Sequence, residues 1–135
     1  MQTAAFFIAM KVKTKKPSKT KLIKKADTIH SLNVRARDKY CLKCGTPNNL
    51  QCAHIINRDN MIHRWDMRSA ITLCYKCHIH WWHAKPLEAA DWLKENYPEK
   101  YAYYWEHRND TLKFPIDFEE LFKQLKEVIK SGYYI

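Results

Sequence analysis

No stretch of this sequence is apolar for the ~20 residues that a membrane-spanning helix requires. The apolar run near the start, Phe6 to Ala9, comes before the lysines, which reverses the order found in a secretory signal peptide. No internal repeat is visible, and 135 residues are too few for two ordinary domains. We therefore expect a single soluble, cytoplasmic domain that does not cross a membrane.

Acidic residues are absent from the first 25 positions, which contain eight of the 24 basic residues. The other 16 basic residues are nearly balanced by all 14 acids, so the formal charge of +10 belongs mainly to this tail. A flexible basic arm at 1–20 favours a polyanion, either nucleic acid or an anionic membrane surface; a solubilising tail is the alternative. The lysines that we expect to contact nucleic acid are Lys15, Lys16, Lys19, Lys24 and Lys25.

Four of the five cysteines form two Cys-x-x-Cys pairs, Cys41/Cys44 and Cys74/Cys77. This usage is typical of metal binding in a reducing compartment rather than of disulfide bonds. Four thiolates can close a tetrahedral structural zinc site. Such a site contributes on the order of 10 kcal/mol to folding, which would replace the core that a small two-stranded region lacks.

Apolar residues recur at helical or strand spacing along much of the chain. The predicted elements are a helix at 21–38, strands at 50–56 and 70–73, a helix at 74–83, and helices opened by Pro86 and Pro98. The C-terminal helix is the clearest, because its apolar residues follow the i, i+3, i+4, i+7 rule and Asp117 with Glu120 forms a capping-box-like start. We predict an α+β, helix-rich fold with one domain at 21–135, in which helices at 86–131 build core.

The fifth cysteine, Cys52, lies in the predicted strand at 50–56. Alternation along a strand places it on the same face as His54. We interpret it as a small buried hydrophobic residue.

Several motifs in the middle of the chain resemble the HNH endonuclease family. They are Cys-Leu-Lys-Cys-Gly at 41–45, Leu-Gln-Cys-Ala-His-Ile-Ile at 50–56, Arg-Trp-Asp at 64–66 and Leu-Cys-Tyr-Lys-Cys-His at 73–78. The following segment, 80–88, is similar to the small zinc-containing HNH proteins of bacteriophages. The resemblance implies a ββα-metal (His-Me finger) core at about 41–84. In that core, zinc pins a β-hairpin and a helix around a catalytic divalent cation, Mg²⁺ or Mn²⁺.

The resemblance also implies roles for single residues. His54 matches the general base, and a neutral imidazole is suited to take a proton from water. His78 matches a ligand of the catalytic cation. The structural alternatives are a satisfied strand histidine for His54 and a helix-surface histidine for His78. Ser69 aligns with the middle asparagine of the motif, which orients the base, and Ala53 stands where many members have a further metal ligand.

His83 follows His78 by five residues, and α-helical spacing does not place residues five apart on one face. We therefore expect His83 to be a metal ligand only if it bends in at the end of the helix. Asn57 and Asp66 are candidates for the contacts that are missing because Ala53 and Ser69 depart from the family pattern.

Arg58 and Arg64 flank the loop between the predicted strands. Arginine holds phosphate through two parallel hydrogen bonds, so both are candidates to grip the scissile DNA strand. The alternative is loop solvation or a structural salt bridge.

These patterns predict a metal-dependent DNA endonuclease, a phosphodiester hydrolase that leaves a 5′-phosphate and a 3′-hydroxyl. The alternatives are a non-catalytic zinc-ribbon DNA-binding protein and a structure-selective nuclease that acts on junctions in recombination. The expected partner is DNA rather than a membrane. Phage packaging or recombination proteins are further candidates, in the cytoplasm of the host cell, with the protein as a monomer or homodimer.

Overall fold

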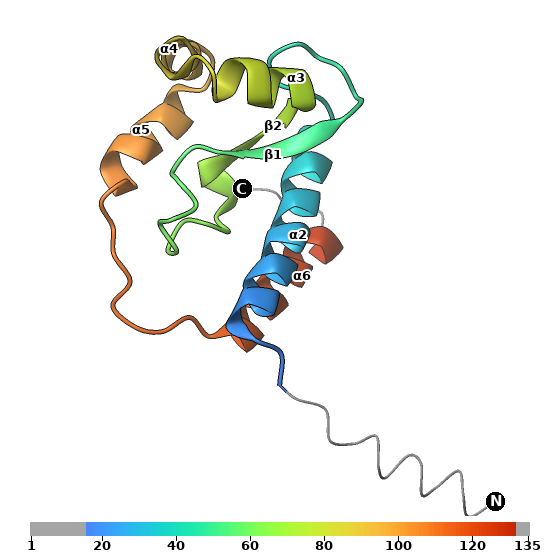
Figure 1. Ribbon diagram of the computed structural model, residues 1–135, viewed down its shortest axis with the longest axis vertical. Coiled ribbons are helices and arrows are strands. Elements are labelled where there is room, and N and C mark those ends of the chain that lie inside the picture. The colour runs from blue at the N-terminus through green and yellow to red at the C-terminus, as the bar shows by residue number, and fades with distance from the viewer. Residues whose placement is uncertain (1–15, 132–135) are drawn as a thin grey trace, which may run out of the picture.

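The computed structural model describes residues 16–131, which form an α+β, helix-rich fold around a two-stranded antiparallel sheet (Figure 1). The predicted fold class is confirmed at this level. Residues 1–15, which include Lys15 and most of the predicted basic arm, lie outside the described residues. Within 16–131, no helix is both long and apolar enough to cross a membrane.

The elements follow one another in the order predicted from the sequence. They are α2 (Lys19–Asp38), β1 (Leu50–His54), the 3-10 turn Met67–Ser69, β2 (Ala70–Cys74), α3 (Tyr75–Cys77), the π-helix His78–Trp82, α4 (Pro86–Asn96), α5 (Pro98–His107) and α6 (Phe118–Ser131). Pro86 and Pro98 open α4 and α5 as predicted, because a first-turn residue needs no backbone donor. α2 begins two residues before its predicted start, since the Ser18 hydroxyl accepts a bond from the Lys21 N–H at 3.3 Å.

The hairpin presents two chemically different faces. Cys52 pairs with Thr72, and Ala53 pairs with Ile71. Successive residues of a strand point to opposite sides. Ala53 and Ile71 therefore face the cysteine pairs and α4, where they form a buried cluster, whereas Cys52 and His54 face α2. Both faces of β2 are covered, and all of its residues are buried.

β1 ends at His54, two residues before its predicted end at Ile56. Beyond His54, the N–H of Ile55 donates to the Ser69 carbonyl at 2.8 Å, and the N–H of Ile56 donates to the Ser69 hydroxyl at 3.2 Å. The regular ladder stops because the 3-10 turn takes these two donors. Ile55 and Ile56 are therefore held by Ser69, and the loop 57–66 begins after them.

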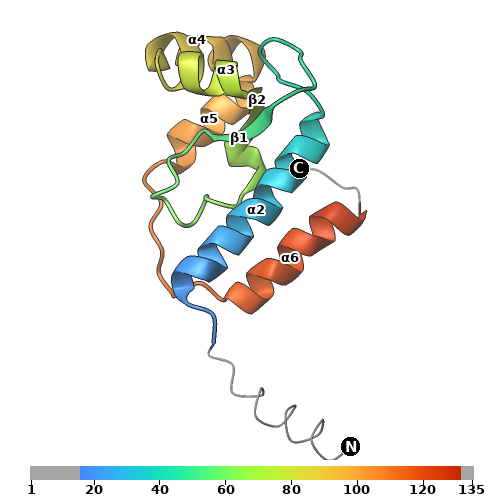
Figure 2. The ribbon, with the colours of Figure 1, turned by 45° about the vertical axis from the view of Figure 1, so that its right-hand side comes forward.

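α6 packs along α2, and both helices begin at the same end of the molecule (Figure 2). The Asp117 carboxylate accepts the Glu120 N–H at 3.1 Å, which confirms the predicted cap. Leu125 is buried in one cluster with Trp65, and the Phe118 ring meets the Trp65 ring edge-on. α6 thus helps to hold the end of the inter-strand loop against α2.

An ion pair between Arg37 and Asp38 ties the end of α2 to the hairpin, with Nε and Oδ1 2.8 Å apart. Asp38 accepts the Thr72 N–H at 2.9 Å, and Arg37 donates to the carbonyl oxygens of Met67 and Ala70. Removing one partner of such a nearly buried pair leaves the other charge uncompensated. The pair therefore fixes where β2 starts relative to α2.

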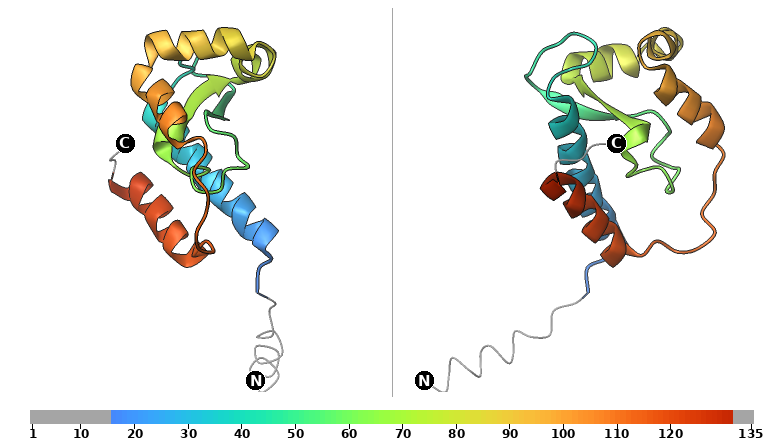
Figure 3. Two further views of the ribbon diagram at one scale, coloured as in Figure 1. Left: turned by 90° about the vertical axis from the view of Figure 1, so that its left-hand side faces the viewer. Right: turned by 180° about the vertical axis from the view of Figure 1, so that it is seen from behind.

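α4 and α5 cover the opposite side of the sheet. In the rear view of Figure 3 the hairpin lies between α2 and α5. Trp92 of α4 packs against the buried cluster that contains Ala53 and Ile71. The hairpin is thus enclosed by helices on both faces, and His54, at the end where the inter-strand loop begins, is half-buried and lines a cavity.

Candidate metal centre and the adjoining cavity

Four cysteine sulfurs meet at the junction between β2 and α3. The group consists of Cys41, Cys44, Cys74 and Cys77, whose sulfurs all lie within 4.8 Å of one another. The sulfurs of Cys44 and Cys74 are 3.7 Å apart. With Zn–S bonds near 2.3 Å, neighbouring sulfurs of a tetrahedral site lie about 3.8 Å apart. The four-cysteine group can therefore hold a structural metal such as zinc.

Backbone N–H groups donate to two of these four sulfurs, which stabilises the negative charge of a thiolate. The N–H of Cys44 points at the sulfur of Cys41, and the N–H of Cys77 at the sulfur of Cys74, both at 3.4 Å. Burial alone would raise the pKa of Cys41, but the surrounding backbone N–H groups lower it to about 7. The thiolate of Cys41, which is its metal-binding form, is therefore accessible near neutral pH, whereas burial and the neighbouring cysteines raise the pKa of Cys77, whose proton a bound metal would displace.

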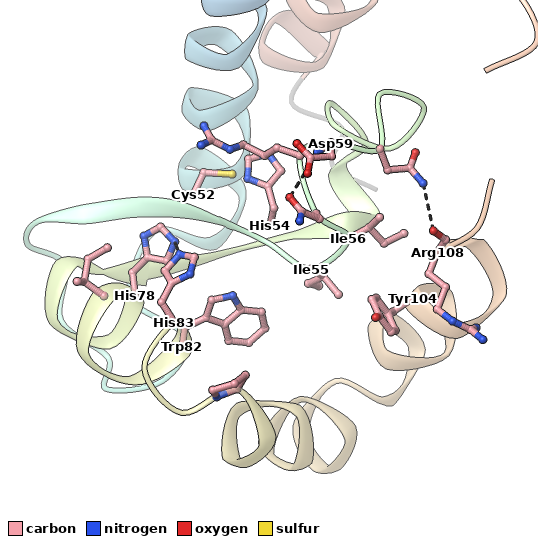
Figure 4. Close-up of a pocket in the computed structure, with 15 residues that line it drawn as sticks. Cys52, His54, Ile55, Ile56, Asp59, His78, Trp82, His83, Tyr104 and Arg108 are labelled. Carbon is pink, nitrogen blue, oxygen red and sulfur yellow. Dashed lines mark hydrogen bonds between the residues drawn. The ribbon is translucent and has the colours of Figure 1, made fainter. Parts of the chain in front are cut away.

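The chain runs from the last cysteine directly into the π-helix. Its backbone bond joins the His83 N–H to the His78 carbonyl, five residues back, at 3.0 Å. This widened turn brings residues five apart onto one face. The α-helical spacing that separated His83 from the face of His78 therefore does not apply, and His83 lies beside His78, as its possible role as a ligand requires. The Nε2 atoms of the two rings are 3.0 Å apart, and Figure 4 shows the rings side by side.

The paired imidazoles fit a divalent cation. Gln51 Oε1 accepts the Nδ1–H of His78 at 2.8 Å, so the Nε2 atom of His78 carries the lone pair. Burial, followed by the charges of His83 and His54, lowers the pKa of His78 to about 4, and the ring is neutral at pH 7. Adjacent ligands of an octahedral ion with bonds of about 2.1 Å lie about 3 Å apart. The separation of the two Nε2 atoms matches this geometry.

His54 stands at the end of β1 with one ring nitrogen committed. Its Nε2–H donates to the carbonyl of Arg64 at 3.2 Å, which leaves the lone pair on Nδ1. Burial lowers the pKa of His54 most; the bond to Arg64 opposes this, and the charge of Arg58 lowers the pKa further. His54 is therefore a neutral imidazole with a free acceptor near neutral pH.

A cavity of about 1010 Å³ joins these groups. Cys52, His54, His78 and His83 all line it, and Figure 4 shows His54 beside Cys52 and apart from the His78–His83 pair. Among residues 16–131, the metal-ligand atom of His54 groups instead with those of His30 and Cys52. The two predicted catalytic histidines thus face a shared space rather than each other.

The residues that depart from the HNH pattern have clear structural positions. Ser69 is fully buried, and its hydroxyl holds the Ile56 N–H where the loop begins. Ala53 is buried in the core and offers no ligand. Asn57 lines the cavity, whereas Asp66 caps the 3-10 turn through the N–H of its second residue.

The two arginines have different environments. Arg58 is exposed and lines the cavity. Arg64 forms a two-point ion pair with Asp27 of α2, with distances of 2.9 Å and 2.7 Å. Asp27 also accepts the indole N–H of Trp65 at 2.9 Å. Arg64 therefore forms a structural salt bridge, the alternative to phosphate binding, and its guanidinium is directed at α2.

The predicted DNA-contacting lysines that the structure describes are exposed. They are Lys16, Lys19, Lys24 and Lys25, and the amine of Lys25 lies 4.8 Å above the Phe122 ring of α6. Figure 1 shows this first part of α2 at the opposite end of the molecule from α4. These lysines therefore form a surface separate from the cavity.

Three features of the site carried no signal in the sequence: Gln51, the buried His30, and a polar network between the loop and α5. In the network, Asp110 Oδ2 lies 2.8 Å from both His63 and His107, and the Tyr103 hydroxyl lies 2.9 Å from the other nitrogen of His63. Asp110 and Tyr103 lie 47 and 40 residues from His63 in the chain, so local patterns do not reveal these contacts. The network fastens the loop that carries Arg58 to α5.

Comparison with known proteins adds no assignment to this site. No protein-family model matches the chain, and neither the curated proteins nor the solved structures contain a match. The interpretation of the cavity therefore depends on the chemistry of the residues that line it.

The four-cysteine group makes a direct prediction for Cys44→Ser. The purified wild-type protein is expected to retain one equivalent of zinc after dialysis, and the variant to lose it together with its thermal stability, because a thiolate ligand is missing. Zinc content and the melting temperature check this. Cys52→Ala is the matched control, since Cys52 lies outside the group, and it should keep the tightly held equivalent. Wild-type zinc content in Cys44→Ser would contradict the site.

Proposed function

We propose that the protein is a metal-dependent DNA endonuclease of the HNH type, which hydrolyses phosphodiester bonds in the cavity between β1 and the π-helix. One observation carries the proposal: His54, neutral and with a free Nδ1, shares a cavity with the paired imidazoles of His78 and His83. A general base that faces a cation site is the equipment for phosphodiester hydrolysis. The hairpin, the helix after it and the four-cysteine group support a ββα-metal core.

His54 is the general base of the proposed reaction. Its Nδ1 accepts a proton from the attacking water, while its Nε2–H stays on the Arg64 carbonyl. Ser69 keeps the backbone after His54 in place through Ile56, so the ring does not need to reorient during the step. Proton transfer to a positioned base contributes about 10²–10⁴-fold to the rate.

His78 and His83 hold the catalytic cation in this proposal, and Gln51 keeps the Nε2 lone pair of His78 available. When bound, the cation supplies positive charge next to the phosphate and leaving oxygens. Imidazole ligands suit a transition ion such as Mn²⁺ better than Mg²⁺, which prefers oxygen ligands. Because Ala53 provides no donor, water or a substrate phosphate completes the coordination.

DNA contact is assigned to two separate surfaces. Arg58 lies at the cavity and can donate to the scissile phosphate. The exposed lysines of α2 give non-specific affinity that falls with salt, because binding releases counterions. A zinc-ribbon protein that binds DNA without cutting it is the second candidate, and the missing ligand at Ala53 favours it.

The decisive variant is His54→Ala in a supercoiled-plasmid nicking assay with Mn²⁺, Mg²⁺ or EDTA. Cleavage by the wild type should require the metal, and the variant should lose about 10²–10⁴-fold in rate, as expected for the loss of a general base. DNA binding in a gel-shift assay should be unchanged. His80→Ala, an exposed histidine of the same π-helix, is the matched control and should cleave normally. Full activity of His54→Ala, or activity in EDTA, would refute the mechanism.

Gln51→Ala tests the cation site without removing a ligand. The Mn²⁺ concentration that gives half-maximal cleavage should rise about 10–100-fold, because His78 loses the partner that fixes its tautomer. The rate at saturating Mn²⁺ should change little. Gln124→Ala on α6 is the control, since Gln124 is exposed and its amide donates to Glu120 on the surface. An unchanged Mn²⁺ requirement in Gln51→Ala would place the cation elsewhere.

The pH profile follows from the lowered pKa of His54. A general base works only when neutral, and burial lowers the pKa of His54 from 6.5, with a further contribution from Arg58. Cleavage should therefore persist as the pH falls through 6.5 and be lost only at lower pH. The measurement is kcat against pH at saturating Mn²⁺ and DNA. Arg58→Ala should move the acid limb upward, and a wild-type limb above 6.5 would exclude His54 as the base.

A further inference from the structure

We infer a second metal site for a borderline transition ion such as Zn²⁺, formed by His30, Cys52 and His54 between α2 and β1. Each residue offers one donor atom, and the three atoms lie within 4.8 Å of one another. The site shares no residue with the four-cysteine group or with the His78–His83 pair.

His30 is a buried histidine whose ring nitrogens lack hydrogen-bond partners within residues 16–131. It lies on α2 and is 1% exposed. An unsatisfied buried polar group costs about 1–3 kcal/mol, and such groups are rare in folded proteins. Burial, followed by the charge of His54, lowers the pKa of His30 to about 4, so the ring is neutral at pH 7. A bound metal ion would satisfy its lone pair.

Cys52 and His54 supply the other two donors from the same face of β1. Figure 4 shows the sulfur of Cys52 next to the His54 ring. Burial raises the pKa of Cys52 to about 12, so the thiol stays protonated by itself. On coordination its proton passes to solvent as the sulfur–metal bond forms. Both residues line the cavity, which gives an ion a route to the site.

The donor set selects the ion. One thiolate and two imidazoles suit Zn²⁺, whereas Mg²⁺ and Mn²⁺ favour carboxylate, carbonyl and water oxygens. Three protein ligands also leave a fourth position of a tetrahedral ion open to water. The thiolate of Cys52 distinguishes this site from the His78–His83 pair, whose remaining coordination positions are left to water or phosphate oxygens in the proposed reaction.

Occupation of the site has a consequence for hydrolysis, and this consequence rests on the proposed function. Nε2 of His54 donates to the Arg64 carbonyl, so His54 can bind a metal only through Nδ1. The same Nδ1 must accept the proton of the attacking water. A metal-bound His54 cannot act as the base, and Zn²⁺ therefore inhibits cleavage by occupying this atom.

Metal binding is tested on the full chain after its four-cysteine group has been filled with Zn²⁺ and excess metal removed. Added Co²⁺ should give a near-ultraviolet thiolate-to-metal band in the wild type, because the His78–His83 pair contains no sulfur. Cys52→Ala should lack the band, and His80→Ala should retain it. Absence of the band in the wild type would overturn the proposal. So would a wild-type band in Cys52→Ala, which would arise from exchange into the four-cysteine group.

Inhibition is measured by adding Zn²⁺ to Mn²⁺-dependent plasmid cleavage. Half-inhibition should need about tenfold more Zn²⁺ or more in Cys52→Ala, since even losing a residue that only orients a ligand weakens metal binding by this factor. Equal inhibition of wild type and variant would place the inhibitory ion at His78 and His83 and refute the role. If no metal supports cleavage, the proposed function fails, and the Co²⁺ band still decides the metal site.

Discussion

The convergence of four cysteine sulfurs at the junction of β2 and α3 is the constraint on which the site depends. It joins the segment before β1 to the end of β2, and it thereby fixes the start of the helix that follows. His78 is the next residue after Cys77, so its position relative to β1 is set by the same junction. The two-stranded sheet seen within residues 16–131 has little core with which to hold this geometry, and metal–thiolate bonds can supply the missing stability.

The π-helix is the second constraint, because it changes which residues share a face. In an α-helix the partner of His78 would be four residues away, whereas the widened turn selects His83. Such turns are rare and are found frequently at functional sites, which agrees with a ligand pair at this position. The hydrogen bond from His78 to Gln51 then links the pair to β1, and the Nε2 atoms of His78 and His83 lie 3.0 Å apart.

The two faces of β1 contact different groups of potential metal ligands. On the α4 side, Gln51 contacts the imidazole pair, and on the α2 side His54 meets Cys52 and His30. The base of the proposed reaction and its cation therefore approach the cavity from different faces of one strand. Both groups line one cavity, and His54 also lies beside the other two residues of the proposed second metal site. Arg64, held by Asp27, has the structural task of keeping its carbonyl on the His54 ring.

The sequence alone determined the features that follow local rules. The cysteine spacing, the helix starts at Pro86 and Pro98, and the Asp117 cap depend on a few neighbouring residues, and each has the predicted structure. Only the tertiary structure decided the roles of Gln51, His30, His83 and Arg64, and it joined His63 to Asp110. Those roles depend on strand register, on one extra residue in a helical turn, and on distant partners, such as His78 for Gln51 and Asp27 for Arg64, which are 27 and 37 residues away. Short-range spacing does not encode such contacts, because they exist only once the hairpin is packed between its helices.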